Sequence, residues 1–354
     1  MTSSIEELLA KWDGEAVVTR YDARYDTYMF IGIHSTALGP AAGGTRMRTY
    51  ETPADALADT MRLAEGMTFK LAAAGLPSGG GKAVLAVPRL FQGAERRELL
   101  LRYADLIESL RGTYQTGPDM NTGAADMDII GERTRHVFGR SPQRGGAGSS
   151  APDTAVGVYH GIRASCEYAL GSPDLSGRTV LLQGLGGVGR VLLDLLVRDG
   201  ARVLVTDVDQ ERVAEAQAST GADVVPVDEV IGTPCDVFSP CAVGGVLTAG
   251  TIPRLRCRVV AGAANNQLGV RDDARLLTDA GILYAPDFVI NSGGALHLFG
   301  LEVLRWSTEQ LAAKLSAIGE SLLEIFRQAA ASGTTTEDAA EAIARARLDK
   351  AASR

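Results

Sequence analysis

The first half of the chain mixes strand-like and helix-like patterns. Residues 16–33 alternate between apolar and polar positions in two runs around a polar DARYDT segment, which predicts a β-hairpin. Residues 52–75 have helical periodicity, with Thr52 as a suitable cap and Gly75 at the end. Beyond them, KAVLAVP predicts a buried strand, GAERRELLLRYADLIESL a helix, and residues 112–130 a short strand, a loop and a helix.

The second half alternates strands with helices. DTAVGVYHGIRASCEYAL predicts a helix, and from Arg178 onward the apolar runs RTVLLQ, ARVLVTD, CDVFSP, RVVAGA and ILYAP are separated by helical or loop segments. This alternation is typical of a doubly wound parallel sheet. Residues 139–153, GRSPQRGGAGSSAPD, are the richest in Gly, Ser and Pro and are interpreted as a hinge.

We therefore expect an α/β protein of two domains with a cleft between them. The first is an α/β domain at residues 1–148, and the second is a doubly wound domain at 149–326. The tail at 327–354 includes an amphipathic helix with a capping signal at Thr335 or Thr336. We expect this helix to be exposed and to pack back on the first domain.

Composition narrows the class of protein. The 354 residues carry a net charge of −8, with Lys and Arg dispersed, which argues against nucleic acid as a partner. The sequence contains no apolar stretch of about 18 residues, so we predict no membrane span. The N-terminus lacks the pattern of a secretory signal. Four cysteines without a CxxC pair, and four histidines, predict no metal site. We expect a cytoplasmic protein.

A glycine motif in the second half predicts a dinucleotide site. Gly184, Gly186 and Gly189 have the GxGxxG spacing, with an apolar strand before them and an uninterrupted helix after them. A second strand ends at Asp207, 18 residues beyond Gly189, close to the separation expected for the acid that binds the ribose hydroxyls. A carboxylate there would repel the extra phosphate of NADP, and no Arg directly follows it, the first being Arg212 five residues on, so we predict NAD.

Three polar residues in the first half are candidates for chemistry: Lys70 in GMTFK, Lys82 after three glycines, and Asp119 in TGPDMNTG. GGGK is not a phosphate loop because Ala83 replaces the required Ser or Thr, and DMNTG lacks the later Gly and Glu of a calcium loop. We interpret the glycine run as room for a small ligand beside the backbone. Taken singly, Lys70 could serve the helix dipole and Asp119 a turn. A lysine opening a buried strand is costly without a role.

Long ordered motifs carry a resemblance to a known family. The chain resembles the leucine, valine and phenylalanine dehydrogenases, relatives of glutamate dehydrogenase, through STALGPAAGGTR, GMTFK, LPSGGGKAV, TGPDMNTGAADMD, GRSPQRGGAGSS, QGLGGVG, AGAANNQL and APDFVINSGG. It is most similar to the actinobacterial phenylalanine dehydrogenases. The resemblance implies an N-terminal substrate, catalytic and oligomerisation domain, a C-terminal Rossmann domain, and a homo-oligomer. It also implies an L-amino acid, a 2-oxo acid and ammonium as small-molecule partners.

The resemblance also implies roles for matching residues. Lys82 would be the general acid/base, and Asp119 would relay a proton. Lys70 and Asn265 would bind the substrate carboxylate. The other substrate positions would be Ala42, Gly43, Gly44, Gly117, Pro118, Ala295 and Leu298. The cofactor positions would be Arg46, Asp119, Ser150, Thr154, Gly184, Leu185, Gly186, Gly187, Val188, Gly189, Arg190, Asp207, Arg212, Ala242, Val243, Ala263, Ala264 and Asn265.

The predicted reaction is reversible NAD-dependent oxidative deamination, most readily of L-phenylalanine to phenylpyruvate. Leucine enzymes of the family carry bulkier residues where this chain has Ala42 and Ala295, and small walls leave room for an aromatic ring. Leucine, valine, tyrosine and tryptophan remain alternatives. A catalytically silent NAD-binding sensor would be expected to have lost Lys82 or Asp119. A malic enzyme or one-carbon dehydrogenase would not explain GMTFK, GGGK and AANNQ together.

Overall fold

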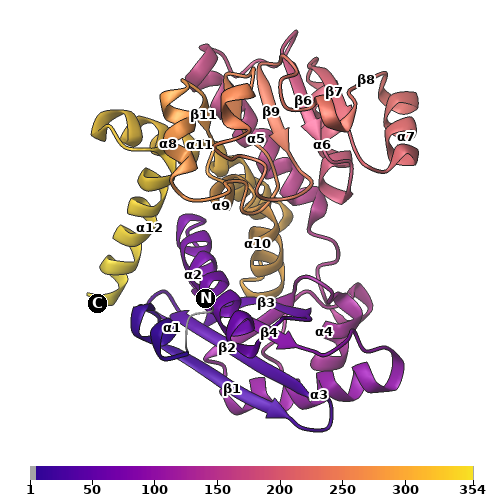
Figure 1. The fold of residues 1–354 in the computed structure, drawn as a ribbon, viewed down its shortest axis with the longest axis vertical. Coiled ribbons are helices and arrows are strands. Elements are labelled where there is room, and N and C mark those ends of the chain that lie inside the picture. The colour runs from indigo at the N-terminus through magenta and orange to yellow at the C-terminus, as the bar shows by residue number, and fades with distance from the viewer. Residues whose placement is uncertain (1–4, 354) are drawn as a thin grey trace. The chain divides into compact units, whose positions relative to one another are not determined.

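The chain forms two compact units, which we describe separately. The computed structural model describes residues 5–353. Unit 1 comprises Met1–Gly148, Leu298–Arg305 and Ala344–Arg354, and unit 2 comprises Ser149–His297 and Trp306–Ile343. Each unit has its own sheet (Figure 1). In the described residues, no helix combines the length and the apolarity that a membrane crossing needs.

Unit 1 is built on a mixed five-stranded sheet in the order β1-β2-β4-β3-β5. Strands β1 and β2 form the expected antiparallel hairpin, and β4 pairs antiparallel with β2 but parallel with β3, which also pairs parallel with β5. The strand bounds are β1 Ala16–Asp22, β2 Thr27–Ser35, β3 Ala41–Arg48, β4 Gly79–Ala86 and β5 Tyr114–Pro118. The carboxyl ends of β3, β4 and β5 therefore point the same way.

Helices cover both faces of this sheet because its strands are apolar on both sides. Helix α2 packs on one face, where Phe30 and Val84 meet Leu57 and Met61. The opposite face buries a larger cluster that includes Leu85, Leu99 and Tyr103. The helix bounds of this part are α1 Ile5–Lys11, α2 Pro53–Ala73, α3 Gly93–Ser109, α4 Ala124–Ile130 and the 3₁₀ turn η1 Pro142–Arg144.

Local signals fix both ends of α2. The Thr52 hydroxyl accepts the Asp55 N–H while the Asp55 carboxylate accepts the Thr52 N–H, a capping box. At the other end, the guanidinium of Arg347 donates to the carbonyls of Ala72 and Ala73 at 2.8 and 2.7 Å, supplying partners that the last helical turn lacks. Residues at opposite ends of the sequence therefore complete one helix.

Unit 2 is a parallel six-stranded sheet in the order β11-β10-β9-β6-β7-β8. Strands β7 and β9 lie on either side of β6, so the chain reverses its direction of travel there, which is the topological switch point of a doubly wound sheet. The bounds are β6 Thr179–Gln183, β7 Arg202–Thr206, β8 Asp223–Val224, β9 Val237–Pro240, β10 Val259–Val260 and β11 Leu283–Tyr284. The predicted doubly wound sheet is confirmed.

The helices of this part of the chain are α5 Ala151–Leu170, α6 Gly187–Arg198, α7 Gln210–Thr220, α8 Asp273–Asp279, α9 Asp287–Ile290, α10 Gly293–Leu298, α11 Thr308–Ser332 and α12 Thr336–Ala352. Short 3₁₀ turns lie at η2 Val227–Glu229 and η3 Ile252–Arg254, and a π-helical turn, η4, at Phe299–Val303. Gly157 allows helix α5 to approach α11 closely, because a side chain at this position would collide with Ile318.

The structure differs from the expected elements in three places. Strand β3 was not predicted, because Gly43 and Gly44 weaken its pattern. Strand β4 begins at Gly79, three residues before the predicted start. The tail expected at 327–354 contains the end of α11 and all of α12, and residues 306–343 belong to unit 2.

Helix α12 is also less exposed than expected. Ala339, Ala340 and Ala344 are buried, and Thr335 caps the helix by accepting the Asp338 N–H. Glu337 lies in the first turn with one carboxylate oxygen buried and without a hydrogen-bond partner among the described residues. Burial, together with nearby negative charge, raises the pKa of Glu337 to about 8.

Candidate functional site

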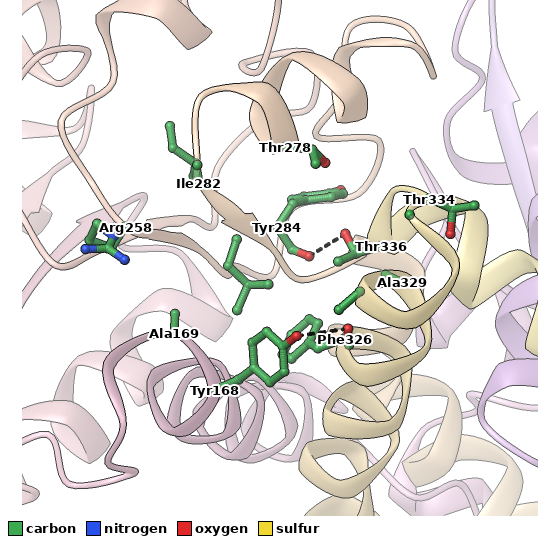
Figure 2. Close-up of a pocket in the computed structure, with 14 residues that line it drawn as sticks. Tyr168, Ala169, Arg258, Thr278, Ile282, Tyr284, Phe326, Ala329, Thr334 and Thr336 are labelled. Carbon is green, nitrogen blue, oxygen red and sulfur yellow. Dashed lines mark hydrogen bonds between the residues drawn. The ribbon is translucent and has the colours of Figure 1, made fainter.

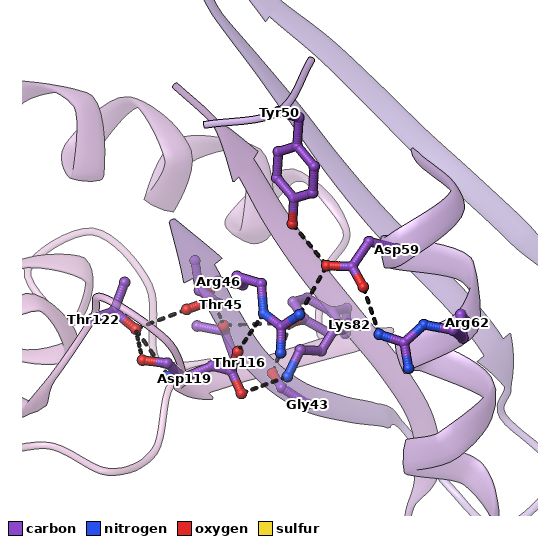
Figure 3. A network of polar contacts seen from close by, with 11 residues as sticks. Gly43, Thr45, Arg46, Tyr50, Asp59, Arg62, Lys82, Thr116, Asp119 and Thr122 are labelled. Atoms are coloured by element: carbon purple, nitrogen blue, oxygen red, sulfur yellow. Dashed lines mark hydrogen bonds and ion pairs between the residues drawn. The ribbon is translucent and has the colours of Figure 1, made fainter. Parts of the chain in front are cut away.

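Lys82 and Asp119 form a buried ion pair in unit 1. Lys82 is on β4 and Asp119 follows the end of β5, and the Lys82 Nζ atom lies 2.8 Å from Asp119 Oδ1 (Figure 3). The Lys82 side chain is 5% exposed, whereas 25% of the Asp119 side chain is accessible. The pair therefore presents its carboxylate side to solvent and holds its ammonium beneath.

A second layer of charges surrounds the pair. Arg46 on β3 donates to Asp119 at 3.0 Å and to Asp59 at 2.8 Å, so one guanidinium joins two carboxylates (Figure 3). Asp59 on α2 also accepts from Tyr50 at 2.7 Å and from Arg62 at 2.7 Å. This network fixes the Arg46 side chain, which in turn orients the Asp119 carboxylate.

The environment shifts both pKa values of the pair. Burial lowers the pKa of Lys82, and the positive charge of Arg46 lowers it further, while the Asp119 carboxylate acts in the opposite direction. Burial opposes the ionisation of Asp119, but Lys82, a backbone hydrogen bond and Arg46 prevail and lower its pKa to about 2. Arg46, a cofactor position in the sequence analysis, is thus also a positive neighbour of Lys82.

The loop after β5 holds Asp119 in place. The Asp119 N–H donates to the Thr122 hydroxyl at 2.9 Å, and that hydroxyl donates to the Thr45 carbonyl at 2.7 Å. Asn121 has a left-handed backbone (φ 60°), and its amide donates to the Met47 carbonyl at 3.0 Å. Both bonds tie the loop to β3, so the loop that carries Asp119 is bound to the strand that carries Arg46.

The glycines before Lys82 have a different purpose from the one expected. A Cβ at Gly80 would lie 2.1 Å from the Thr68 backbone nitrogen, and one at Gly81 would lie 2.9 Å from the Tyr114 ring. The run therefore lets α2 and β5 approach β4, and the interpretation as open room for a ligand is wrong. Thr68 and Gly80 are each two residues from a lysine, so the segments bearing Lys70 and Lys82 are in direct contact.

At other glycines of the candidate substrate wall, the space that a side chain would need is also occupied by protein atoms. At Gly43 a Cβ would meet the Gly81 carbonyl oxygen at 1.8 Å, and at Gly44 it would meet the Pro118 carbonyl at 2.5 Å. At Gly117 it would collide with the ring of Phe138, a residue that the sequence analysis did not select. Three further candidates of unit 1 are Ala42, fully buried on β3, Pro118 at the end of β5, and Leu298 at the end of α10.

The glycine motif of unit 2 has the geometry of a phosphate cradle. Gly184 has a left-handed φ of 101°, and a Cβ at Gly189 would lie 1.9 Å from the Gly184 carbonyl oxygen, so helix α6 begins directly against the strand end. A Cβ at Gly186 would meet nothing within 4 Å, which leaves this side of the loop open. Helix α6 starts at Gly187 and continues through Val188 and Arg190, so its free N–H groups face an anion site. The residues fit a dinucleotide.

Asp207 lies beside this loop. One oxygen of its carboxylate accepts the Leu185 N–H at 2.6 Å, and the other accepts the Asp209 N–H at 2.9 Å. Arg212 pairs with Asp209 at 3.1 Å and is half exposed. The carboxylate of Asp207 thus bridges the glycine loop and the end of β7, where a ribose binds in this fold.

The remaining cofactor candidates follow neighbouring strands or begin a helix. Ala242 and Val243 come after β9, next to the switch point, and Ala263, Ala264 and Asn265 come after β10, one strand further along the sheet. Ser150 precedes α5 and accepts the Thr154 N–H and hydroxyl through its carbonyl. A Cβ at Gly294 would meet the Thr154 hydroxyl, so Ala295 is adjacent to this helix start.

Asn291 is a residue that the sequence analysis missed, although it lies in the quoted motif APDFVINSGG. Its buried amide donates to Asn265 Oδ1 at 2.8 Å and to the Ala263 carbonyl at 3.1 Å. It therefore holds together the loop that carries three of the candidate residues, Ala263, Ala264 and Asn265.

Two other features of the described residues offer less chemistry. A cavity of about 380 Å³ in unit 2 is lined mainly by apolar groups such as Tyr168, Phe326 and Ile282, with Arg258 as its charged residue (Figure 2). Asp13, His34 and Glu65 in unit 1 have ligand atoms within 4.8 Å of one another, but both nitrogens of His34 already bond to Thr68 and Asp13.

Fold and site together define a class. Unit 2 offers a dinucleotide cradle at the switch point of a doubly wound sheet, and unit 1 offers a buried lysine with a lowered pKa beside a carboxylate. A cradle of this type holds a hydride-accepting cofactor, and such a lysine accepts and returns protons. The chain is an oxidoreductase of the dinucleotide-dependent class.

Comparison with known proteins identifies the family. The dimerisation domain model of the Glu/Leu/Phe/Val dehydrogenases matches residues 20–136, and the Glutamate/Leucine/Phenylalanine/Valine dehydrogenase model matches residues 204–354. The chain belongs to the Glu/Leu/Phe/Val dehydrogenase family, as the sequence motifs indicated, and it is an amino-acid dehydrogenase.

Similar proteins differ in substrate. The chain is 40% identical to a leucine dehydrogenase of Thermoactinomyces intermedius, with 98% of this chain and 93% of the relative covered. It is 42% identical to a valine dehydrogenase of Streptomyces coelicolor, with 95% and 93% covered. The crystal structure of L-tryptophan dehydrogenase from Nostoc punctiforme matches with a TM-score of 0.87 at 36% identity, covering 99% of this chain and all of that one.

Proposed function

We propose that the protein catalyses the NAD-dependent, reversible oxidative deamination of an L-amino acid, with L-phenylalanine as the preferred substrate. The observation that carries the reaction type is the 2.8 Å pair of Lys82 and Asp119, in which the lysine is buried and its pKa is lowered. A lowered pKa favours the neutral amine, which can act as a general base.

The roles of the residues follow from the reaction. NAD, when bound, accepts the hydride from the substrate α-carbon. Lys82 takes a proton from the water that attacks the resulting iminium and returns one to the departing ammonia. Asp119 relays protons between the substrate nitrogen and Lys82, and Arg46 and Asp59 position its carboxylate. Lys70 and Asn265 bind the substrate carboxylate, the ammonium of Lys70 by ion pairing.

We propose NAD as the preferred cofactor. The carboxylate of Asp207 accepts the Leu185 N–H at the glycine loop, and a second negative group at the adjacent ribose would be repelled by it. Arg212, the first arginine after Asp207 in the sequence, is engaged by Asp209, which reduces its capacity to bind that group. The other cofactor-binding assignments, a homo-oligomer and a cytoplasmic location are part of the same proposal.

Small residues support an aromatic substrate. Ala42 and Ala295 supply little side-chain volume, and an aromatic ring needs more room than an isobutyl group. The Phe138 ring lies against Gly117, and its centroid is 5.1 Å from that of the Phe299 ring, so two buried aromatic rings of unit 1 back this part of the wall. Branched-chain activity is the second candidate, because relatives at about 40% identity are named leucine and valine dehydrogenases.

A steady-state panel of L-Phe, L-Tyr, L-Trp, L-Leu, L-Val and L-Glu with NAD tests the proposal. We expect the largest kcat/KM with L-Phe, and a largest value with L-Leu or L-Val would establish the second candidate instead. Lys82→Ala is expected to lose turnover and still bind NADH, as read by nucleotide fluorescence. An active Lys82→Ala enzyme would refute the assigned base.

A further inference from the structure

A cavity of about 430 Å³ in unit 1 is surrounded by arginines. Its wall includes Gln115, Val137, Phe138, Gly145, Val303 and Glu302, together with Arg135, Arg140, Arg144 and Arg305. These residues come from β5, from the segment that follows α4, from η1, and from the π-helical turn η4 with the residues after it. Four guanidinium groups thus face one hollow that contains a single carboxylate.

The charges of this arginine cavity are poorly compensated. Among residues 5–353, no carboxylate oxygen lies within 4.0 Å of a guanidinium nitrogen of Arg135, Arg144 or Arg305, and Arg140 has Asp128 at 3.7 Å, beyond hydrogen-bond distance. Elsewhere in unit 1, arginines bond to carboxylates directly, as Arg96 does to Asp126 at 2.6 Å. Like charges that converge without partners repel one another, so the cavity favours an anion.

The one acidic residue of the cavity offsets one of the four positive charges, and its hydrogen-bond partners are backbone amides. Glu302 accepts the Gly139 N–H at 3.0 Å through one oxygen and the Ala147 N–H at 2.8 Å through the other. These bonds close the loop that carries Arg140 and Arg144. Glu302 therefore shapes the cavity and leaves the guanidinium groups available.

Backbone geometry also singles out this place. Arg305 has a left-handed φ of 56°, which is rare for a residue with a side chain, and it follows Leu304, the cap of the π-helical turn at Phe299–Val303. Such strain persists where the surrounding structure over-determines it, and it gathers at binding sites. Here it ends the turn so that Arg305 lines the cavity.

We propose that the arginine cavity binds a small organic phosphate with at least two negative charges. Planar guanidinium groups bind phosphate oxygens in bidentate fashion, and this favours phosphate over a monovalent anion. The apolar surfaces of Val137, Phe138 and Val303 would contact the organic part of the ligand. The volume is within the range of small-ligand sites. The loop of this cavity leads to Ser149, the first residue of unit 2, so occupancy would stiffen the connection.

Calorimetric titration of the full chain with inorganic pyrophosphate tests the site, with and without saturating NADH. NADH covers the glycine loop of unit 2, which also attracts phosphates. We expect pyrophosphate to bind in both conditions, and binding that disappears with NADH would overturn the proposal. Sodium chloride at equal ionic strength serves as the screening control.

Variants then locate the binding. R144S/R305S removes two exposed arginines of the cavity, and R254S/R256S removes two exposed arginines of unit 2. We expect the first pair to weaken pyrophosphate binding at least tenfold and the second to leave it within twofold. Equal affinity in wild type and R144S/R305S, or an equal loss in both pairs, would refute the arginine cavity. The comparison holds even if NADH itself fails to bind, so the outcome is separable from the proposed dehydrogenase activity.

Discussion

Replacing Asp119 by Asn should move the pH dependence of catalysis. The substitution keeps the shape of the side chain and removes the negative charge 2.8 Å from the Lys82 ammonium. That charge raises the pKa of Lys82, against the larger effect of burial, so its loss lowers the pKa further. Oxidative deamination requires the neutral amine, and its rate rises with pH through the Lys82 pKa.

The size of the effect follows from the geometry. Two unit charges 2.8 Å apart interact by about 6 kcal/mol at an effective dielectric constant of about 20. This figure is a ceiling, because a quarter of the Asp119 side chain is exposed and water screens the pair. We expect the ascending limb of kcat/KM to move to lower pH, with a lower plateau because the proton relay is lost.

The assay is the pH profile of kcat/KM for L-phenylalanine with saturating NAD, in wild type and in Asp119→Asn. Asp105→Asn is the matched control, because Asp105 is a half-exposed carboxylate of the same unit that pairs with Arg133 at 3.4 Å. The ascending limb of the pH profile of Asp105→Asn should lie at the same pH as in wild type. A limb of Asp119→Asn that is unmoved, or that lies at higher pH, would refute the reasoning that Lys82 is the titrating base.

Three further outcomes are expected. Gly189→Ala should abolish NADH binding or lower the melting temperature by several degrees, because its Cβ would lie 1.9 Å from the Gly184 carbonyl oxygen. The control Gly186→Ala should fold normally, because a Cβ there would meet nothing within 4 Å. Equal thermal shifts of the two variants would contradict this. Glu337→Gln should gain stability over wild type as pH rises, because a folded pKa of about 8 makes the native state lose stability between pH 4.5 and 8. Urea unfolding at pH 5 and pH 8 measures it, and a constant difference would exclude the effect. Asp207→Ser should raise kcat/KM with NADP relative to NAD at least fivefold, and an unchanged ratio would show that this carboxylate does not select the cofactor.

The sequence predicted the fold class because the signals were local. Alternating strands and helices after Arg178 indicated the doubly wound sheet, and the glycine spacing marked its switch point. Strand β3 was not predicted because two glycines, Gly43 and Gly44, interrupt its apolar run. The path of the chain at 298–305 and 344–354, which returns to unit 1, left no local signal, since it depends on which distant surfaces each segment buries.

The site was predictable as a set of residues and less so as a network. Motifs selected Lys82 and Asp119, which lie 37 residues apart in sequence and 2.8 Å apart in space. Asp59 was missed because it lies at the flank of the apolar face of α2, where a polar residue is unremarked. Phe138 was missed because its contact with Gly117 depends on how the segment after α4 packs against β5. Pairs of this kind arise from tertiary structure, and helical or strand periodicity contains no information about them.

Unit 1 is assembled from three separate stretches of chain, and this constrains how the molecule is made. When the first 148 residues have left the ribosome, Phe138 still lacks the Phe299 ring and the end of α2 still lacks Arg347. The unit gains both only when translation has passed through almost the entire second unit. A premature stop near the C-terminus therefore leaves unit 1 incomplete as well. Loss of the last 11 residues would remove Arg347 and leave the carbonyls of Ala72 and Ala73, about 270 residues upstream, without this hydrogen-bond donor.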